Sequence, residues 1–106
     1  MIWESSNIHY SPQALDDLEE IWSYIHDELC NPSAARNTID GILKAVERLK
    51  VFSGAGAVLS FSDGINSGYR FVMYGDYLAF YRVMESDVFV DRIIYGKRDY
   101  MSILFD

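Results

Sequence analysis

The chain has 106 residues, the length of one domain, and a formal net charge of -7. Half of its residues are hydrophobic, which excludes a globally disordered chain, and the acidic excess disfavours non-specific binding to nucleic acid. The single cysteine, Cys30, excludes an internal disulfide, and the absence of an apolar run of membrane-spanning length or of a signal peptide leads us to expect a soluble cytoplasmic protein.

The first predicted elements are a short strand and a long helix. Residues 7–10 place an apolar side chain at every second position, which predicts a strand. Ser11 and Pro12 then supply an N-cap hydroxyl and a first-turn proline. One apolar stripe follows at helical spacing over about five turns, and it consists of Leu15, Leu18, Ile21, Trp22, Ile25 and Leu29. The acids near the start of this helix are expected on a solvated face, and they are Asp16, Asp17, Glu19 and Glu20.

A second amphipathic helix begins at Asn31 and Pro32, which repeat the same start signal. Its apolar stripe consists of Ile39, Ile42, Leu43, Val46 and Leu49. Lys44, Arg48 and Lys50 lie near its C-terminal end, where the helix dipole favours cations. Because only a few residues link the two helices, we expect an antiparallel helix hairpin.

Residues 53–68 contain four glycines and predict a loop, mobile or functional, with a short extended piece at 57–61. Three strands are predicted next, at 69–74, 77–84 and 88–95, and the candidate turns are Gly75-Asp76 and Ser86-Asp87. Two-residue turns would place Arg70 opposite Tyr81 and would pair Arg82 with Asp91 across the strands. Residues 97–105 are expected to form a helical turn or an extended tail, with Met101, Leu104 and Phe105 docked on the core.

The predicted order of elements is β-α-α-β-β-β over a single domain of residues 1–106. This places the fold in the α+β class, with an N-terminal helix hairpin packed on a mostly antiparallel sheet.

The basic residues of the C-terminal half are the ambiguous chemical signal. Five of the nine lie there: Arg70, Arg82, Arg92, Lys97 and Arg98. Two interpretations stay open, because these cations can be structural ion-pair partners or can form a surface that meets an anionic partner. Metal-independent RNA cleavage needs a base, a cation beside the phosphate and a proton donor, which arginine, lysine and tyrosine can supply.

Cofactor sites are not indicated by the sequence. His9, His26 and Cys30 lack the spacing of metal ligands, so no metal site is predicted. The glycines at 54, 56, 64 and 68 match neither a phosphate-binding loop nor a dinucleotide fingerprint, so no cofactor is expected.

Several segments together resemble the RelE/ParE toxin superfamily of bacterial type II toxin–antitoxin modules. They are the helix residues 11–21, Tyr69-Arg70, residues 75–78 with 80–83, and the ending Arg92-Ile93-Ile94-Tyr95-Gly96-Lys97-Arg98-Asp99-Tyr100. The resemblance extends from about His9 to Phe105. It implies a small toxin that is neutralised by an antitoxin wrapped around it, as a hetero-oligomer.

The superfamily divides into RelE-type nucleases, which cut mRNA in the ribosomal A site, and ParE-type toxins, which poison DNA gyrase. Relative to the nuclease pattern, Val72 and Leu78 replace cations, and Tyr100 lies closer to Arg98 than the tail tyrosine usually does. Because losing one transition-state contact costs about 10²–10³ in rate, the resemblance favours the ParE-like branch, with gyrase as the target and growth inhibition or plasmid stabilisation as the role.

The resemblance also assigns candidate residues. For antitoxin or target binding they are Arg70, Arg82, Arg92, Lys97, Arg98 and Tyr100. The alternative, a ribosome-dependent mRNA endonuclease, would use Arg70, Arg98 and Tyr100 as its catalytic residues. A further alternative is a non-toxic module that only binds its antitoxin.

Overall fold

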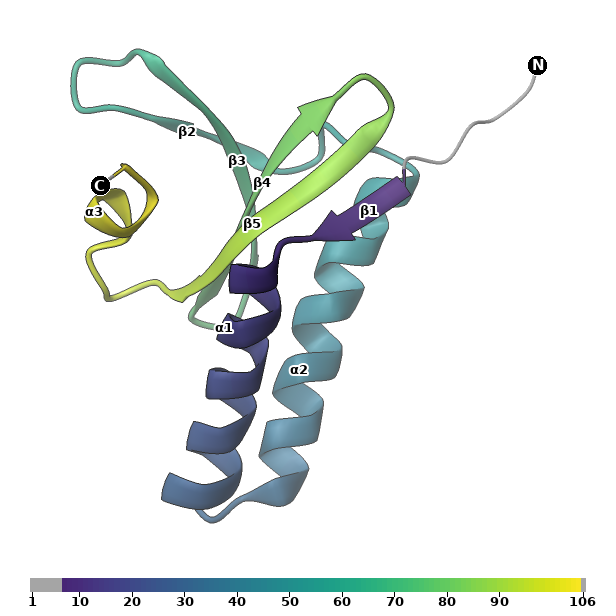
Figure 1. Ribbon diagram of the computed structural model, residues 1–106, viewed down its shortest axis with the longest axis vertical. Coiled ribbons are helices and arrows are strands. Elements are labelled where there is room, and N and C mark those ends of the chain that lie inside the picture. Colours follow the sequence, from purple (N-terminus) through teal and green to yellow (C-terminus); the bar gives the residue numbers. More distant parts are fainter. Residues whose placement is uncertain (1–6, 106) are drawn as a thin grey trace.

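The computed structural model describes residues 7–105 and contains one five-stranded sheet with two long helices on one face and a short helix on the other (Figure 1). The strands are β1 (Asn7–Tyr10), β2 (Ala57–Ser60), β3 (Asn66–Tyr74), β4 (Tyr77–Met84) and β5 (Asp87–Tyr95). The helices are α1 (Pro12–Ser23), α2 (Pro32–Glu47) and α3 (Tyr100–Phe105), with a π-helical turn η1 (Tyr24–Glu28) and a 3-10 turn η2 (Arg48–Lys50).

The sheet has the order β1-β5-β4-β3-β2, and only the β1–β5 pair is parallel. This confirms the predicted α+β class and the mostly antiparallel sheet. The strand count differs, because the extended piece expected at 57–61 pairs with β3 and forms the edge strand β2. None of the helices in residues 7–105 has the length and apolar character needed to cross a membrane.

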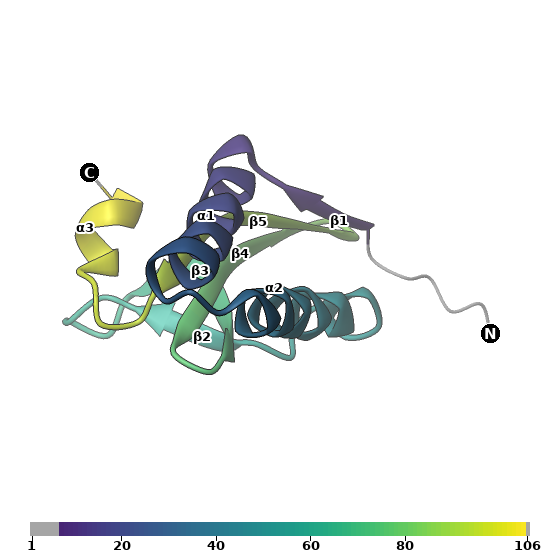
Figure 2. The ribbon, with the colours of Figure 1, turned by 90° about the horizontal axis from the view of Figure 1, so that it is seen from below.

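The helix hairpin begins with the two predicted caps. The Ser11 hydroxyl accepts a hydrogen bond from the Ala14 amide at 2.9 Å, and the Asn31 side chain accepts one from the Ala34 amide at 3.1 Å. Each cap satisfies an amide that the first helical turn leaves without a partner. The two helices lie side by side, and α3 lies apart from them at the other side of the sheet (Figure 2).

The apolar stripe predicted on the first helix was partly wrong. Ile21 and Ile25 are buried, but Leu15, Trp22 and Leu29 are 53%, 41% and 55% exposed. Ala14 and Asp17 occupy the buried face instead, so the contact face is rotated away from the bulkiest residues. The stripe of the second helix is confirmed, because Ile42, Val46 and Leu49 are buried and the other two members are half-buried.

The hairpin between β3 and β4 is the one predicted. Gly75-Asp76 forms the turn, Tyr74 pairs with Tyr77, and Arg70 lies opposite Tyr81. Gly75 has a φ of +56°, in the left-handed region where glycine carries no steric penalty.

The hairpin between β4 and β5 has a different register from the prediction. Met84 pairs with Asp87, so the turn is Glu85-Ser86, and Arg82 lies opposite Phe89 rather than Asp91. The pairing shifts between Phe80 and Tyr81, which leaves Asp91 as an extra residue on β5. Such a β-bulge redirects side chains and increases the local twist of the strand.

The sheet has an apolar core on each face. On the helix face, Tyr81, Val88, Val90 and Ile93 pack against the buried residues of α1 and α2. On the opposite face, Leu59, Leu78, Phe80 and Ile94 form a smaller core. Helix α3 covers it with Tyr100, Met101, Ile103 and Leu104, while Phe105 is 40% exposed and packs on Phe61. The predicted docking of Met101 and Leu104 is therefore confirmed.

Candidate functional site

Arg82 is held by Asp91, the extra residue of the bulge. Its Nε lies 2.7 Å from Asp91 Oδ2 and its Nη2 lies 3.2 Å from Oδ1, a two-pronged ion pair. The Tyr69 hydroxyl also donates to Asp91 Oδ2, at 2.7 Å. Burial and this hydrogen bond raise the pKa of Tyr69 to about 12. The predicted Arg82–Asp91 ion pair therefore exists. Contrary to the prediction, the two residues are not direct cross-strand partners but are brought together by the bulge.

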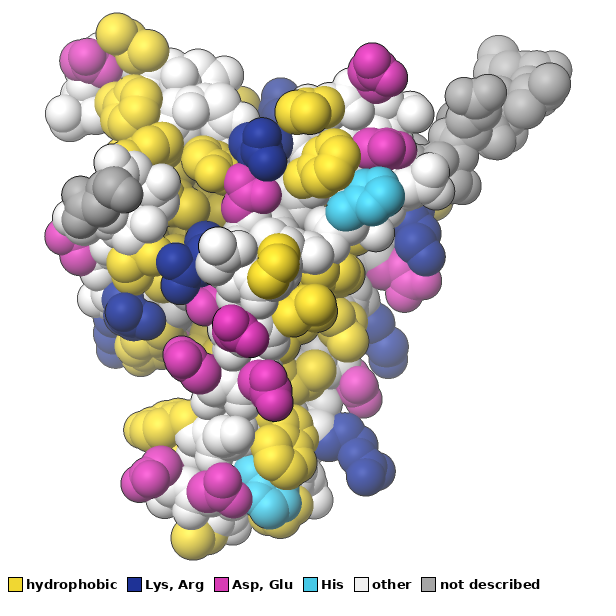
Figure 3. All heavy atoms as spheres, in the orientation of Figure 1, with side chains coloured by type: hydrophobic (Ala, Val, Ile, Leu, Met, Phe, Trp, Pro, Cys, Tyr) yellow, Lys and Arg dark blue, Asp and Glu magenta, His cyan; other side chains and the backbone are white. Residues whose placement is uncertain are grey.

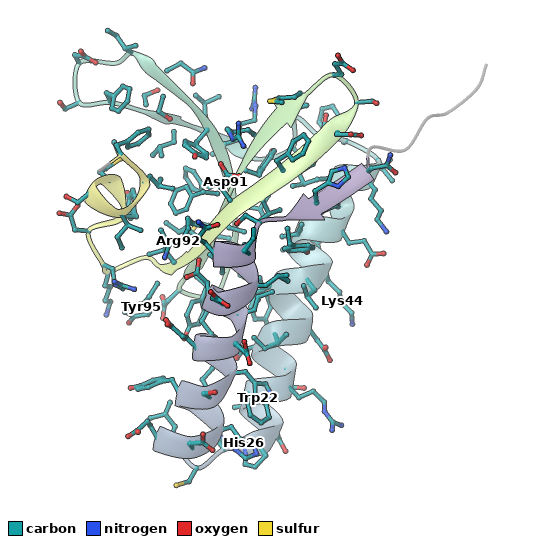
Figure 4. The ribbon with its side chains drawn as sticks, in the orientation of Figure 1. Trp22, His26, Lys44, Asp91, Arg92 and Tyr95 are labelled. Carbon is teal, nitrogen blue, oxygen red and sulfur yellow. The ribbon has the colours of Figure 1, made fainter. Side chains whose placement is uncertain are left out.

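Arg92 is held by Asp17 of α1. Its Nε lies 2.8 Å from Asp17 Oδ2 and its Nη2 lies 3.0 Å from Oδ1, while the Ile93 amide donates to Oδ2 at 2.8 Å. Arg92 and Asp91 lie beside the start of α1 (Figure 4). Asp17 is only 8% exposed, so the expectation of a solvated acidic face was wrong for this residue. The sequence did contain a signal for this burial, because Asp17 lies at helical spacing between Ala14 and Ile21, on the buried face of the helix.

Arg70 is tied to the loop that precedes β2. Its Nη1 donates to the Gly56 carbonyl at 2.9 Å. Beside it, the buried Tyr81 hydroxyl accepts from the Gly56 amide at 3.0 Å and donates to the Ser53 carbonyl at 2.8 Å. A Cβ on Gly56 would lie 2.5 Å from this hydroxyl and 2.7 Å from the Phe71 carbonyl oxygen. The start of the predicted loop is thus fastened to the sheet by hydrogen bonds between its backbone and the side chains of Arg70 and Tyr81.

Lys97 and Arg98 follow β5 and are exposed. Within residues 7–105, neither side chain has an ion pair or a hydrogen bond. Tyr100 starts α3, and its ring packs on Phe80 with 5.3 Å between centroids.

The three candidate catalytic residues have different surroundings. Arg70 contacts the loop before β2, Arg98 lines a groove beside α1, and Tyr100 packs in the core under α3. The positions where a nuclease would carry further cations are apolar core positions, because Val72 packs on the helix-face core and Leu78 is buried in the core under α3. Arg98 and Tyr100 lie two residues apart, and the Tyr100 amide donates to the Arg98 carbonyl at 2.9 Å.

A groove beside α1 has a volume of about 590 Å³. Its lining includes Ile21, Tyr24, Leu29, Tyr77, Tyr95 and Arg98. Tyr24 and Leu29 come from the region of the π-helical turn, and Tyr77 and Tyr95 are cross-strand partners with ring centroids 5.7 Å apart. No sequence pattern predicted that these residues come together, because they are distant along the chain.

Comparison with known proteins identifies relatives of the chain. Residues 8–100 match the family model described as ParE toxin of type II toxin–antitoxin system, parDE. The fold is similar to that of a chain in the structure of a chromosomal ParDE toxin–antitoxin system from P. aeruginosa, with a TM-score of 0.71 and 20% identity, covering 88% of this chain and 98% of that one. No curated protein gave a match.

Two further solved structures have the same fold at lower similarity. One is a chain of the toxin–antitoxin complex RelBE2 from Mycobacterium tuberculosis, with a TM-score of 0.55 and 15% identity over 86% of this chain and 98% of that one. The other is YafQ from E. coli BL21(DE3), with a TM-score of 0.52 and 16% identity over 95% and 99%. The resemblance to the RelE/ParE superfamily is thereby confirmed, and the chain belongs to the ParE toxin family of type II toxin–antitoxin systems.

Proposed function

We propose that this toxin acts by binding DNA gyrase and is neutralised by a cognate antitoxin in a hetero-oligomeric complex. The observation that carries the proposal is that two positions where a nuclease would carry cations are apolar, because Val72 packs on the helix-face core and Leu78 is buried in the core under α3. A nuclease needs its base, cation and proton donor within hydrogen-bond reach of one phosphate. A toxin that works by binding has no such requirement.

The charges of the protein support the same choice. The formal net charge is -7, and Arg82 and Arg92 are neutralised by Asp91 and Asp17. A ribosomal target is coated with phosphate, and association with it gains from free cations that displace counterions. Two of the nine cations are thus unavailable for that purpose, and the acidic excess of the chain favours a protein target.

Support for an antitoxin partner comes from the relatives. The ParDE and RelBE2 structures are a toxin–antitoxin system and a toxin–antitoxin complex. In this chain, Lys97 and Arg98 are exposed and have no ion-pair partner within the described residues. Their charges are therefore offered to the acids of an antitoxin.

Expression of the chain alone in a bacterium tests the target. The proposal predicts filamentous cells with an induced SOS response and an inhibition of replication, while translation continues. Cuts in mRNA at codon positions would contradict it and would support the endonuclease alternative. The absence of any growth defect would support a module that only binds its antitoxin.

Two substitutions distinguish the mechanisms further. Arg98→Ala and Tyr100→Phe remove the candidate cation and the candidate proton donor. The gyrase mechanism predicts that toxicity persists in Tyr100→Phe, because the Tyr100 ring packs on Phe80 and the substitution keeps that contact. Loss of toxicity in this variant, with an unchanged thermal midpoint, would support acid–base catalysis instead.

A further inference from the structure

Helix α1 has an apolar flank that faces away from β5. Asp17 turns towards β5, where it accepts from the Ile93 amide. Leu15, Leu18 and Trp22 follow one another at three- and four-residue steps on the other side of the buried face. Leu15 and Trp22 are 53% and 41% exposed, and the Trp22 ring stacks on His26 near the end of the hairpin, with 4.3 Å between centroids (Figure 4).

Helix α2 supplies the second wall of a seam between the two helices. Gly41 faces β3, since a Cβ at this position would meet the ring of Tyr74. Ile39 and Leu43 lie on the opposite flank of the buried residues of α2, which directs them towards α1, and both are half-buried. In the space-filling view, hydrophobic side chains run down the middle of the hairpin and acidic ones lie to their left (Figure 3).

The two sides of this seam differ in charge. The segment of α1 and η1 contains six acids and no lysine or arginine. Two of the acids are paired, with Arg92 and His26. The others form no ion pair within residues 7–105, and they are Asp16, Glu19, Glu20 and Glu28. On the α2 side, the charges nearly cancel, because cations and acids alternate there: Arg36, Asp40, Lys44 and Glu47.

The acidic side of the seam is hollowed. A concavity of about 420 Å³ is lined by Asp16, Glu19, Glu20 and Ser23. The hydrogen bond to Asp17 raises the pKa of Arg92 and the charge of Glu20 adds to this rise, so Glu20 also serves the fold. Carboxylates beside an apolar strip fit a lysine or arginine, whose aliphatic stem lies on the strip while its charge meets the acids.

We propose that an amphipathic helix of gyrase docks along this seam. Its apolar stripe packs between Leu15 and Trp22 on one side and Leu43 on the other. Lysine or arginine residues along one flank of the helix bind Asp16 and Glu19. A protein that binds DNA presents cationic surfaces to the phosphates, and the acidic side of α1 is complementary to such a surface. This inference rests on the proposed action on gyrase and names the surface that makes the contact.

The test measures the toxin concentration that half-inhibits DNA supercoiling by purified gyrase. Leu15→Asp and Trp22→Asp should each raise this concentration about tenfold or more, because a charge enters the apolar contact. The matched control is Ile65→Asp, since Ile65 is 61% exposed and lies outside the hairpin. Glu19→Lys should also raise it about tenfold. Its control is Glu85→Lys, which makes the same charge change at an exposed position between β4 and β5.

A photoreactive benzophenone amino acid in place of Trp22 provides a second readout, because it bonds to whatever lies on the seam. We expect crosslinks to a gyrase segment with apolar residues at three- and four-residue spacing and a flank of lysine or arginine. Thermal midpoints equal to that of the wild type show that a loss of inhibition is not a loss of folding.

Two results would overturn the inference while the proposed action on gyrase stands. One is inhibition by the wild type with equal potency in Leu15→Asp, Trp22→Asp and Glu19→Lys. The other is a crosslink that joins two copies of the toxin, or that joins the toxin to an acidic or non-helical segment of gyrase. Failure of the wild type to inhibit gyrase would overturn both proposals.

Discussion

The arginines on β4 and β5 and the cations that follow β5 differ in their partners. Arg82 and Arg92 each bind one carboxylate through two nitrogens, and hydrogen bonds to Asp91 and Asp17 raise the pKa of both guanidinium groups. Lys97 and Arg98 have no such partner within the described residues. The first pair of cations is therefore held within the fold, and we propose that the second is available for binding. Basic residues that lie close in sequence can thus have different surroundings.

The largest loss of stability is expected from Asp17→Ala, which breaks one of the two arginine–aspartate ion pairs. The substitution leaves Arg92 without its partner and removes the acceptor of the Ile93 amide. Removing one member of a buried ion pair costs about 3–5 kcal/mol, so the free energy of unfolding should fall by about that amount. Urea unfolding measures it. The control Glu19→Gln, at an exposed position of the same helix, should change stability little, and an equal loss in both variants would contradict a structural role for Arg92.

Gly56→Ala should have the next largest effect. The added Cβ would contact the Tyr81 hydroxyl and the Phe71 carbonyl, so the loop held by Arg70 must shift. Overpacking of this kind costs about 1–3 kcal/mol. The matched control is Gly54→Ala, where a Cβ meets nothing within 4 Å. Equal thermal midpoints for the two variants would show that Arg70 and Tyr81 do not fasten the loop.

Asp91→Ala should destabilise the protein less than Asp17→Ala. The side chain of Arg82 is 41% exposed, so solvent screens its ion pair and can hydrate the freed guanidinium. The expected loss is about 1–2 kcal/mol, mainly from the hydrogen bonds of Arg82 and Tyr69. Urea unfolding again provides the measurement. A loss larger than that of Asp17→Ala would reverse the proposed ranking of the two pairs.

Alkaline pH should weaken the Asp91 cluster. The pKa of Tyr69 is about 12 in the folded chain, against 10.0 for an ordinary tyrosine, because of burial and then the hydrogen bond to Asp91. Between these values the unfolded chain loses this proton and the folded chain keeps it, so stability is fully present below pH 10 and falls as the pH rises towards 12.

Thermal midpoints measured across this pH window test the effect. Tyr69→Phe should make the fall shallower, although burial also raises the pKa of Tyr10, Tyr77 and Tyr81, which keep part of the slope. An identical fall in the variant and the wild type would contradict the role assigned to Tyr69.

The smallest effect on stability is expected from Lys97→Glu and Arg98→Glu. Both residues are exposed and make no ion pair within residues 7–105, so the free energy of unfolding should change by less than about 0.5 kcal/mol. Calorimetry checks this expectation. A loss comparable to that of Asp17→Ala would show that these cations stabilise the fold, as Arg82 and Arg92 do.

Local sequence signals predicted the elements of the fold well. Ser11 and Asn31 mark the helix starts, and Gly75 marks the turn that sets the β3–β4 register. These features depend on neighbouring residues, which is why they can be read from the sequence. The β4–β5 register could not be predicted, because Asp91 forms a bulge that depends on Arg82, Tyr69 and the start of α1.

The candidate site was harder to predict than the fold. Each cation could be identified by its residue type, but its role depends on its partner. That partner can be far away in the sequence, since Asp17 lies 75 positions from Arg92. The groove combines Tyr24 and Leu29 with Tyr95 and Arg98 from the far end of the chain. Such long-range combinations arise only when the helix hairpin docks on the sheet.

The central claim, that this ParE-family toxin acts on gyrase, is tested most directly with purified components. The toxin is incubated with bacterial gyrase, ATP and plasmid DNA, and the topology of the plasmid is followed. We predict inhibition of supercoiling with accumulation of gyrase-linked cleaved DNA, and relief when the antitoxin is added. Unaffected supercoiling at a toxin excess, together with cleavage of mRNA on purified translating ribosomes, would contradict the claim.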